Sequence, residues 1–127
     1  MDIDLPDVVA EVTAAFQRYE HALVNNDVTT LNSIFRAEPR TIRYGVGENL
    51  YGHEAIKAFR GARSPVGLAR MLSKTVITTY GRDVAVASTL FHRTTMPGKI
   101  GRQMQTWVRF PDGWHVVAAH VSVIDDV

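Results

Sequence analysis

The sequence of residues 71–124 is MLSKTVITTYGRDVAVASTLFHRTTMPGKIGRQMQTWVRFPDGWHVVAAHVSVI. Four runs in it are rich in Val, Thr, Ile and aromatic residues, and short turn sequences separate them. Such runs are typical of strands joined by tight turns. The runs are Met71–Tyr80, Val84–Thr95, Arg102–Phe110 and Trp114–Ile124, and the turns are Gly81-Arg82-Asp83, Pro97-Gly98 and Pro111-Asp112-Gly113. The pattern predicts an antiparallel meander.

The residues before this meander have helical periodicity. Apolar side chains recur every three or four positions from Pro6 to Leu23, which predicts one amphipathic helix. Asp4 is the expected N-cap, with Pro6 in the first turn. We expect Asn25-Asn26-Asp27 to end this helix and to cap a second, short helix, which Pro39 stops.

Two further elements are expected between the second helix and the meander. Thr41–Tyr44 can form a short strand, and His53–Arg63 has the pattern of a third helix. Helices followed by a meander indicate the α+β class. We therefore expect one domain over residues 1–127, with N-terminal helices packed on a curved antiparallel sheet that has a mixed edge.

Length and composition exclude several classes of protein. The chain has 127 residues, of which 46% are hydrophobic and 21% charged, as in ordinary globular domains and unlike disordered tails or coiled coils. It contains no cysteine, which excludes disulfide frameworks, thiolate metal sites and cysteine nucleophiles. Residues 1–6 carry acids and no basic residue, unlike a secretory signal, and no stretch approaches the ~20 apolar residues of a membrane span. We expect a cytoplasmic protein.

The net charge of +1 hides an uneven distribution. Between Ala55 and Pro111 there are ten basic residues and one acid, Asp83, and most of the basic residues in the chain are arginines. Arginine suits bidentate contacts with carboxylates and phosphates. There is no lysine-rich run or recognition motif for nucleic acid. A small anionic ligand is therefore the expected partner for any arginine that is kept inside, and no nucleic acid or membrane is expected.

The last strands of the predicted meander carry apolar residues on both faces. Helices can cover only one of these faces. We expect the other face to form the interface of a homodimer.

Three stretches carry a resemblance to a known family. They are Ile42–Gly45 (IRYG), Glu48–Ile56 (ENLYGHEAI) followed by Ala58, Phe59, Arg60 and Arg63, and Gln105–Trp114 (QTWVRFPDGW) with Ala119–Ser122 (AHVS). These strings, in this order of helices and strands, resemble the AtzH-like family, which includes HpxZ, a protein associated with oxalurate breakdown. The family belongs to the nuclear transport factor 2-like (NTF2-like, SnoaL-like) superfamily, whose fold is a cone with a ligand pocket at its open end.

The resemblance implies chemistry on carboxylated ureas. AtzH is understood as a decarboxylating amidohydrolase that converts dicarboxyurea to allophanate, and the HpxZ branch belongs to purine-ring catabolism, where oxalurate is a small ureido acid. No metal or organic cofactor is implied. Two alternatives remain open: a non-catalytic ligand-binding or accessory dimer that partners an amidase of the same pathway, and an isomerase or cyclase for a larger apolar substrate.

Tyr19 and Arg43 are the predicted catalytic pair. Tyr19 lies on the apolar stripe of the first helix, so its ring must point into the core or into the cone. In the related ketosteroid isomerase a tyrosine on the corresponding helix donates to a developing oxyanion. That enzyme has an aspartate base near the position of Arg43. The resemblance therefore implies a pocket that lacks this base and gains a cation for a carboxylate.

Arg60 and Arg63 are predicted to bind substrate. Together with Ile56 and Phe59 they fall on one face of the third helix. Either arginine can extend to solvent along an apolar face, which is the common arrangement, or reach the pocket and hold a second carboxylate.

Four residues of the last two strands complete the predicted substrate-binding set: Gln105, Trp107, His120 and Ser122. A hairpin with Gly113 as a bulge would pair Phe110 with Trp114 and place Gln105 opposite Ala119. In that register Gln105 and His120 lie on opposite faces of the sheet, so a regular pairing cannot bring both to one ligand.

Overall fold

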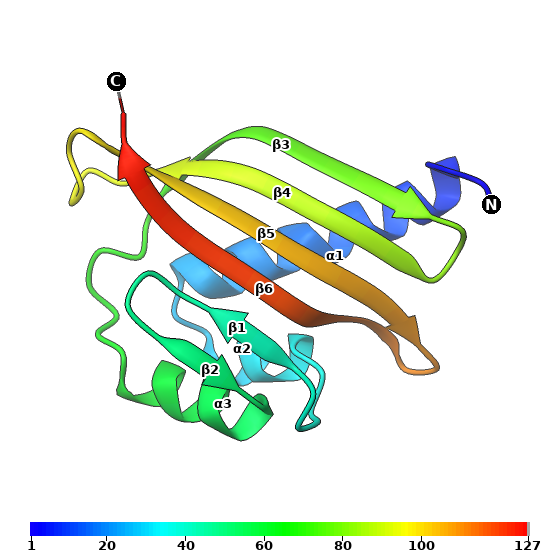
Figure 1. The fold of residues 1–127 in the computed structure, drawn as a ribbon, viewed down its shortest axis with the longest axis horizontal. Coiled ribbons are helices and arrows are strands. Elements are labelled where there is room, and N and C mark those ends of the chain that lie inside the picture. The colour runs from blue at the N-terminus through cyan, green and yellow to red at the C-terminus, as the bar shows by residue number, and fades with distance from the viewer. Residues whose placement is uncertain (127) are drawn as a thin grey trace.

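A computed structural model describes residues 1–126 of the chain (Figure 1). Three helices pack on a single six-stranded sheet, which confirms the α+β prediction. The elements are α1 (Pro6–Val24), α2 (Val28–Ile34), β1 (Ile42–Tyr44), β2 (Asn49–Tyr51), α3 (His53–Ala62), β3 (Met71–Tyr80), β4 (Val84–His92), β5 (Lys99–Phe110) and β6 (Gly113–Asp125). No helix among the described residues is long and apolar enough to cross a membrane.

The strand order in the sheet is β2-β1-β6-β5-β4-β3. Strands β3 to β6 form the predicted antiparallel meander, whereas β1 pairs in parallel with β6 and carries β2 on its outer side. This parallel pairing gives the sheet the expected mixed edge. The sequence did not predict β2, whose three residues follow the break in the pattern at Gly45 and Gly47.

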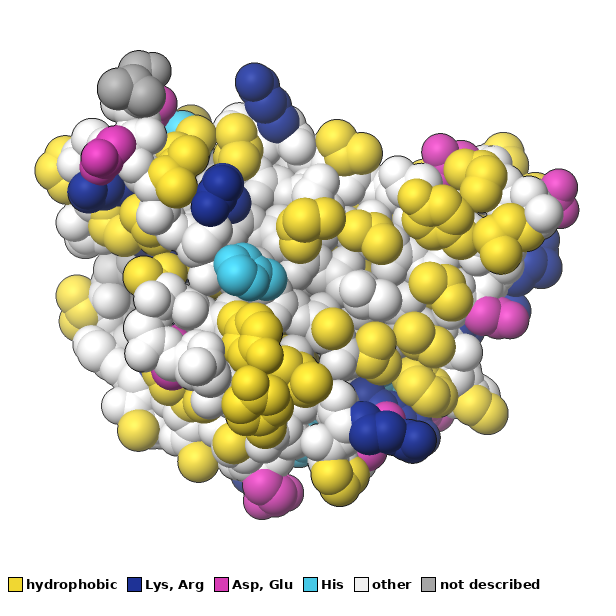
Figure 2. All heavy atoms as spheres, viewed as in Figure 1, with side chains coloured by type: hydrophobic (Ala, Val, Ile, Leu, Met, Phe, Trp, Pro, Cys, Tyr) yellow, Lys and Arg dark blue, Asp and Glu magenta, His cyan; other side chains and the backbone are white. Residues whose placement is uncertain are grey.

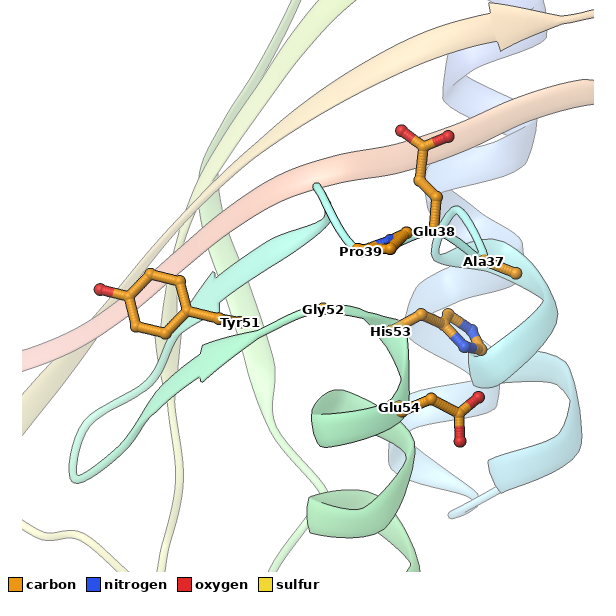
Figure 3. Close-up of a pocket in the computed structure, with 7 residues that line it drawn as sticks. All are labelled: Ala37, Glu38, Pro39, Tyr51, Gly52, His53 and Glu54. Atoms are coloured by element: carbon orange, nitrogen blue, oxygen red, sulfur yellow. The ribbon is translucent and has the colours of Figure 1, made fainter.

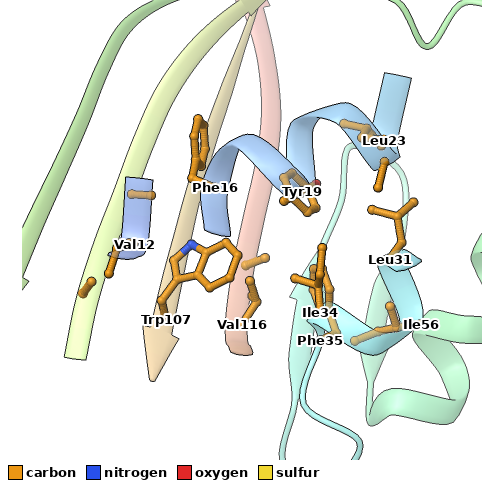
Figure 4. Close-up of a cluster of buried hydrophobic side chains, with 14 residues drawn as sticks. Val12, Phe16, Tyr19, Leu23, Leu31, Ile34, Phe35, Ile56, Trp107 and Val116 are labelled. Atoms are coloured by element: carbon orange, nitrogen blue, oxygen red, sulfur yellow. The ribbon is translucent and has the colours of Figure 1, made fainter. Parts of the chain in front are cut away.

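Helix α1 runs along the inner face of the sheet and buries its apolar stripe there (Figure 4). Val12 and Phe16 pack toward Trp107 of β5 and Val116 of β6, and all four are buried. The helix thereby forms one wall of the molecule's interior and fixes the height of Tyr19, which follows Phe16 by one turn.

The N-terminal cap of α1 differs from the prediction. Leu5 occupies the N-cap position, and no side chain caps the helix. Asp4 adopts a positive φ of 57°, and its carboxylate instead accepts a hydrogen bond of 2.9 Å from the backbone N–H of Thr79 in β3. The sequence could not reveal this, because the partner strand lies 75 residues away.

The cap of α2 is confirmed, but its end is not. The Asp27 carboxylate accepts a hydrogen bond of 3.2 Å from the backbone N–H of Thr30. The helix ends at Ile34, well before Pro39, because Phe35 leaves the helix to form an isolated parallel bridge with Val116. The sheet therefore stops this helix before the proline does.

The pairing of β5 with β6 gives the predicted partner of Gln105 by a different route. At the hairpin Phe110 pairs with Gly113, and a bulge beyond the Trp107–Val116 pair shifts the register by one residue. Gln105 consequently lies opposite Ala119, as predicted, whereas the predicted pairing of Phe110 with Trp114 is wrong. The observed turn is one residue shorter than the predicted one, which shifts the pairing by one position near the turn. The bulge adds that residue back in β6, so the pairs beyond it are the predicted ones.

The outer face of the sheet has no helix over it (Figure 1), and Figure 2 shows hydrophobic side chains gathered across it. Exposed members include Tyr44, Tyr51, Met71, Val76 and Met104. The Tyr44 and Tyr51 hydroxyls are 2.9 Å apart, and the His120 ring meets Tyr44 edge to face at 6.3 Å between centroids.

Truncating Trp107 tests how much the fold depends on the contact between α1 and the sheet. Trp107 has no exposed surface, so Trp107→Ala should leave a cavity and lower the free energy of unfolding by about 3–5 kcal/mol. Chemical denaturation measures this, with the exposed residue Val66→Ala as the control. An unchanged denaturation midpoint for Trp107→Ala would show that this packing does not stabilise the fold.

Candidate functional site

A cavity of about 220 Å³ lies between α1, α3 and the inner face of the sheet. Tyr19 of α1, the β1–β2 turn, Phe59 of α3 and the last residues of β4 contribute to its wall. The charged residues around it are Arg43, Glu48, Arg63, Arg70 and Arg93. Four of the five charged residues that line this small hollow are therefore cations.

Tyr19 and Arg43 line this one cavity, although they come from a helix and a strand far apart in the sequence. Tyr19 is buried, and its ring packs at a tilt against Phe35 with 6.3 Å between centroids. Arg43 is the middle residue of β1 and lies between Leu50 of β2 and Ala119 of β6. The two strands on either side hold its backbone, so its side chain leaves from a fixed point.

Arg43 already has a carboxylate partner, which sequence reasoning missed. Its Nη1 donates to Glu48 Oε1 at 2.8 Å, and Glu48 reaches it from the β1–β2 turn. Gly45 makes this fold-back possible, since a Cβ at that position would lie 1.8 Å from Glu48 Oε1. The Gly-Val-Gly-Glu sequence indicated a turn that ends in an acidic residue. Only the folded turn shows that this residue, Glu48, pairs with Arg43.

A second ion pair in the wall involves two more residues that sequence reasoning missed. Arg70 Nε donates to Glu20 Oε1 at 2.8 Å, and its Nη2 donates to Gln103 Oε1 at 2.9 Å. Arg70 follows a loop, and Glu20 is a charged residue at the flank of the apolar stripe of α1, so neither position indicated a buried contact. Gln103, two residues before Gln105 on the same face, is therefore the glutamine that lines the cavity.

Three arginines at the site have polar atoms without hydrogen-bond partners among the described residues. The atoms are Arg60 Nε and Nη1, Arg63 Nε and Nη2, and Arg93 Nε, all hidden from solvent. None of the three forms an ion pair with residues 1–126. Buried donors are normally satisfied, so these groups suit an anionic ligand.

The pKa values of these arginines reflect the crowding. Burial lowers the pKa of Arg60 to about 10, with smaller lowering by Arg43 and Arg63, whereas the Tyr19 phenol acts in the opposite direction. Burial also lowers the pKa of Arg63 and of Arg93, and nearby guanidinium groups lower both further. Each charge is thus held in a site that disfavours it.

Aromatic rings support the guanidinium groups. Arg43 and Arg63 lie 5.3 and 5.9 Å from the Phe59 ring centre, and Arg70 and Arg93 lie 4.6 and 4.8 Å from that of Phe91. Such contacts are favourable for desolvated cations. Gly101 admits the second ring, since a Cβ there would lie 2.1 Å from Phe91 Cζ.

The other predicted site residues lie outside the cavity. Arg60 is buried and stacks on Phe35 at 4.2 Å without lining the hollow, so it does not extend to solvent. Gln105 and Trp107 are core residues, and the indole Nε1 donates to Gln105 Oε1 at 3.2 Å. Both point toward α1, further from the cavity than Gln103.

His120 and Ser122 are on the outer face of the sheet. His120 packs on Tyr44, and the Ser122 hydroxyl accepts a hydrogen bond of 3.1 Å from Arg102 Nε. They were predicted to bind substrate, but the strand register places them on the face opposite the cavity, since His120 pairs with the outward-facing Met104.

A second hollow, of about 360 Å³, lies at the start of α3 (Figure 3). Glu38 and Glu54 border it, and the His53 ring Nε2 is 2.7 Å from the Asn32 carbonyl oxygen, to which it donates. Two carboxylates make this hollow unsuited to an anion. Within residues 1–126, no three His, Asp or Glu side chains come together as a candidate metal site.

The profile of the AtzH-like family matches residues 1–127. The chain belongs to the AtzH-like family. This confirms the resemblance drawn from the IRYG, ENLYGHEAI and QTWVRFPDGW stretches, and it places the arginine-lined cavity in an AtzH-like domain with the NTF2-like fold. No curated protein matches the chain.

Several solved structures share this fold. A protein of unknown function from Pectobacterium atrosepticum is 60% identical, with a TM-score of 0.95 over 98% of this chain and 96% of that one. A cystatin-like fold protein from Burkholderia xenovorans is 50% identical, with a TM-score of 0.96 over 100% and 99%. An NTF2-like superfamily protein from Salmonella enterica is 25% identical, with a TM-score of 0.76 over 95% and 94%.

The buried, unpaired charge of Arg60 should reduce stability. Its pKa of about 10 in the fold is below its ordinary value, so the unfolded chain binds the proton more tightly and the charge opposes folding below pH 10. Arg60→Met should therefore raise the free energy of unfolding at pH 7 by about 1–3 kcal/mol. This advantage should shrink as the pH rises above 10.

Chemical denaturation without ligand, at pH 7 and again above pH 10, measures the gain in stability and its decrease at high pH. Arg40→Met, at an exposed arginine, is the matched control. A variant less stable than the wild type at pH 7 would mean that the stacking of Arg60 on Phe35 outweighs the cost of burying its charge.

Proposed function

We propose that the protein is a cofactor-independent decarboxylating amidohydrolase-like enzyme for a small carboxylated urea, either dicarboxyurea or an oxalurate-type ureido acid. The observation that carries the proposal is that the Tyr19 ring and the Arg43 side chain line one small cavity whose walls hold more guanidinium groups than carboxylates. Membership of the AtzH-like family supports the same chemistry.

The size and charge of the cavity favour this class of ligand. A volume of about 220 Å³ is below the ~300–1,000 Å³ of pockets for drug-sized ligands, so a steroid or polyketide is disfavoured. Four arginines against one glutamate among the lining residues favour an anion. The Gln103 Nε2 group is buried without a hydrogen-bond partner among the described residues and can donate to a urea carbonyl.

The reaction requires one bond to break and one proton to move. In dicarboxyurea the bond between a urea nitrogen and the carbon of its N-carboxylate breaks, its electron pair remains on nitrogen, and CO2 leaves. Oxalurate has no N-carboxylate, so this step applies to dicarboxyurea alone. Tyr19 donates a proton to that nitrogen, and solvent restores the phenol. Arg43 orients the substrate, and the surrounding guanidinium groups stabilise the negative charge on the phenol oxygen after transfer.

Removing the phenol should abolish most of the turnover. Because a positioned general acid contributes about 10²–10⁴-fold, Tyr19→Phe should lower kcat for dicarboxyurea by that factor. CO2 release measures the rate, and Tyr80→Phe, at an exposed tyrosine outside the cavity, is the matched control with wild-type rate expected.

Arg43→Gln should also lower kcat/KM by at least about tenfold, since it removes a charge-assisted contact, while Arg40→Gln should not. Full turnover by both Tyr19→Phe and Arg43→Gln would contradict the mechanism. Binding of dicarboxyurea without CO2 release, together with co-purification of an amidase, would favour the accessory dimer instead.

We also propose that a second copy of the chain covers the outer face of the sheet. The exposed Tyr51, Tyr44 and Met104 lie there on β2, β1 and β5, with β6 between the last two. A shallow hollow is lined by Tyr44, Met104 and His120 of β6. Apolar patches of this kind mark protein interfaces.

Analytical ultracentrifugation tests this interface. The wild type should sediment as a dimer of the 14.1 kDa chain, and Met104→Asp should weaken the association at least about tenfold, because it places a charge in an apolar contact. Val66→Asp, in an exposed loop, should leave it unchanged. A monomeric wild type at every concentration would exclude the interface.

A further inference from the structure

The four arginines that line the cavity form two similar pairs. Arg43 and Arg63 share the ring of Phe59, and Arg70 and Arg93 share the ring of Phe91. In each pair one arginine has a carboxylate partner: Arg43 is bound by Glu48, and Arg70 by Glu20. The other member, Arg63 or Arg93, has no ion-pair partner among residues 1–126.

The protein thus neutralises two of the lining arginines itself and leaves two cations unsatisfied. Hidden Nε atoms on both Arg63 and Arg93 lack hydrogen-bond partners, as does Nη2 of Arg63. Arg60, buried nearby, adds a third unpaired positive charge without reaching the hollow. A dianion matches the two unpaired cations that line the hollow, whereas a monoanion leaves one of them uncompensated.

We propose that Arg63 and Arg93 form a carboxylate-binding subsite, distinct from Arg43 with its Glu48 partner, which makes the cavity selective for dianions over monoanions. The ligand class is a small molecule with a carboxylate at each end. The role of the subsite in catalysis rests on the proposed function. In the proposed decarboxylation, Arg63 and Arg93 hold the carboxylate that stays on the product, while the carboxylate that leaves as CO2 lies near Tyr19.

The unpaired arginines reach the cavity from two different elements. Arg63 follows α3 and lies beside Arg43 on the Phe59 ring, whereas Arg93 follows β4 and lies beside Arg70 on the Phe91 ring. Arg43 enters from β1, where Glu48 occupies its Nη1. A carboxylate therefore gains more by contacting Arg63 and Arg93, whose N–H groups have no competing acceptor, than by displacing Glu48.

Calorimetric titration with a matched pair of inert acids tests the subsite. Glutarate has two carboxylates separated by three atoms, as in dicarboxyurea, and butyrate is the same chain without the second carboxylate. The wild type should bind glutarate roughly 10–100-fold more tightly than butyrate, the range expected for one additional charge-assisted contact. Arg63→Gln and Arg93→Gln should each weaken glutarate binding at least about tenfold and reduce the glutarate-to-butyrate ratio.

The controls separate a lost subsite from a damaged fold. Arg40→Gln, on the exposed surface, should bind glutarate like the wild type. Without ligand, the Tm of Arg63→Gln and Arg93→Gln should equal or exceed that of the wild type, because each removes a cation from a repulsive cluster. Glutarate should raise the Tm of the wild type more than that of either variant.

Different outcomes overturn different claims. Equal affinity of the wild type for butyrate and glutarate, or unchanged glutarate affinity in both variants, would refute the subsite. Unchanged KM for dicarboxyurea in both variants would refute it too, while leaving the proposed function intact. Tight glutarate binding without any turnover of dicarboxyurea would refute the proposed function and leave the subsite standing.

Discussion

Guanidinium groups repel one another and lose hydration when they are buried, and this fold places four of them around one small hollow with a fifth, Arg60, buried nearby. Among residues 1–126, two carboxylates, Glu20 and Glu48, form ion pairs with this group of arginines. Burial lowers the pKa of Arg60, Arg63 and Arg93, and repulsion from the neighbouring guanidinium groups lowers it further. Buried cations without partners are unfavourable for stability alone, and this supports the proposal that the cavity binds an anion.

The scaffold meets this electrostatic demand with aromatic rings and glycines. Phe59 and Phe91 each contact two guanidinium groups, which keeps the cations apart from water while offering them a π face. Gly101 admits the ring of Phe91, and Gly45 lets Glu48 fold back to Arg43. The polar site therefore depends on two positions where a side chain is absent.

The same sheet face serves two purposes along its length. At one end, Trp107 and Val116 pack against α1 in a dry core, and at the other, Gln103 and Phe91 face the cavity. Tyr19 stands at the boundary, since its ring belongs to the core cluster and also lines the hollow. Rigid packing behind the phenol limits its motion, which suits a group that must meet its reaction partner in one orientation.

The sequence alone determined the helices, the meander, the α+β class and the family, because these follow from local periodicity, turn residues and continuous strings of side chains. It also selected Tyr19, Arg43 and Arg63, which the fold brings to one cavity. It could not find Glu48, Arg70, Arg93 or Glu20, since their roles arise from contacts between segments up to 50 residues apart. It favoured Gln105 over Gln103, although both lie on one face of β5, because the position of the cavity along that face depends on how the helices and loops pack over it. It also included His120, because the strand pattern did not show which face of the sheet lines the cavity. Tertiary structure alone decided which charges are paired and which are left for a ligand, because electrostatic pairing is a property of distance in space and not of order along the chain.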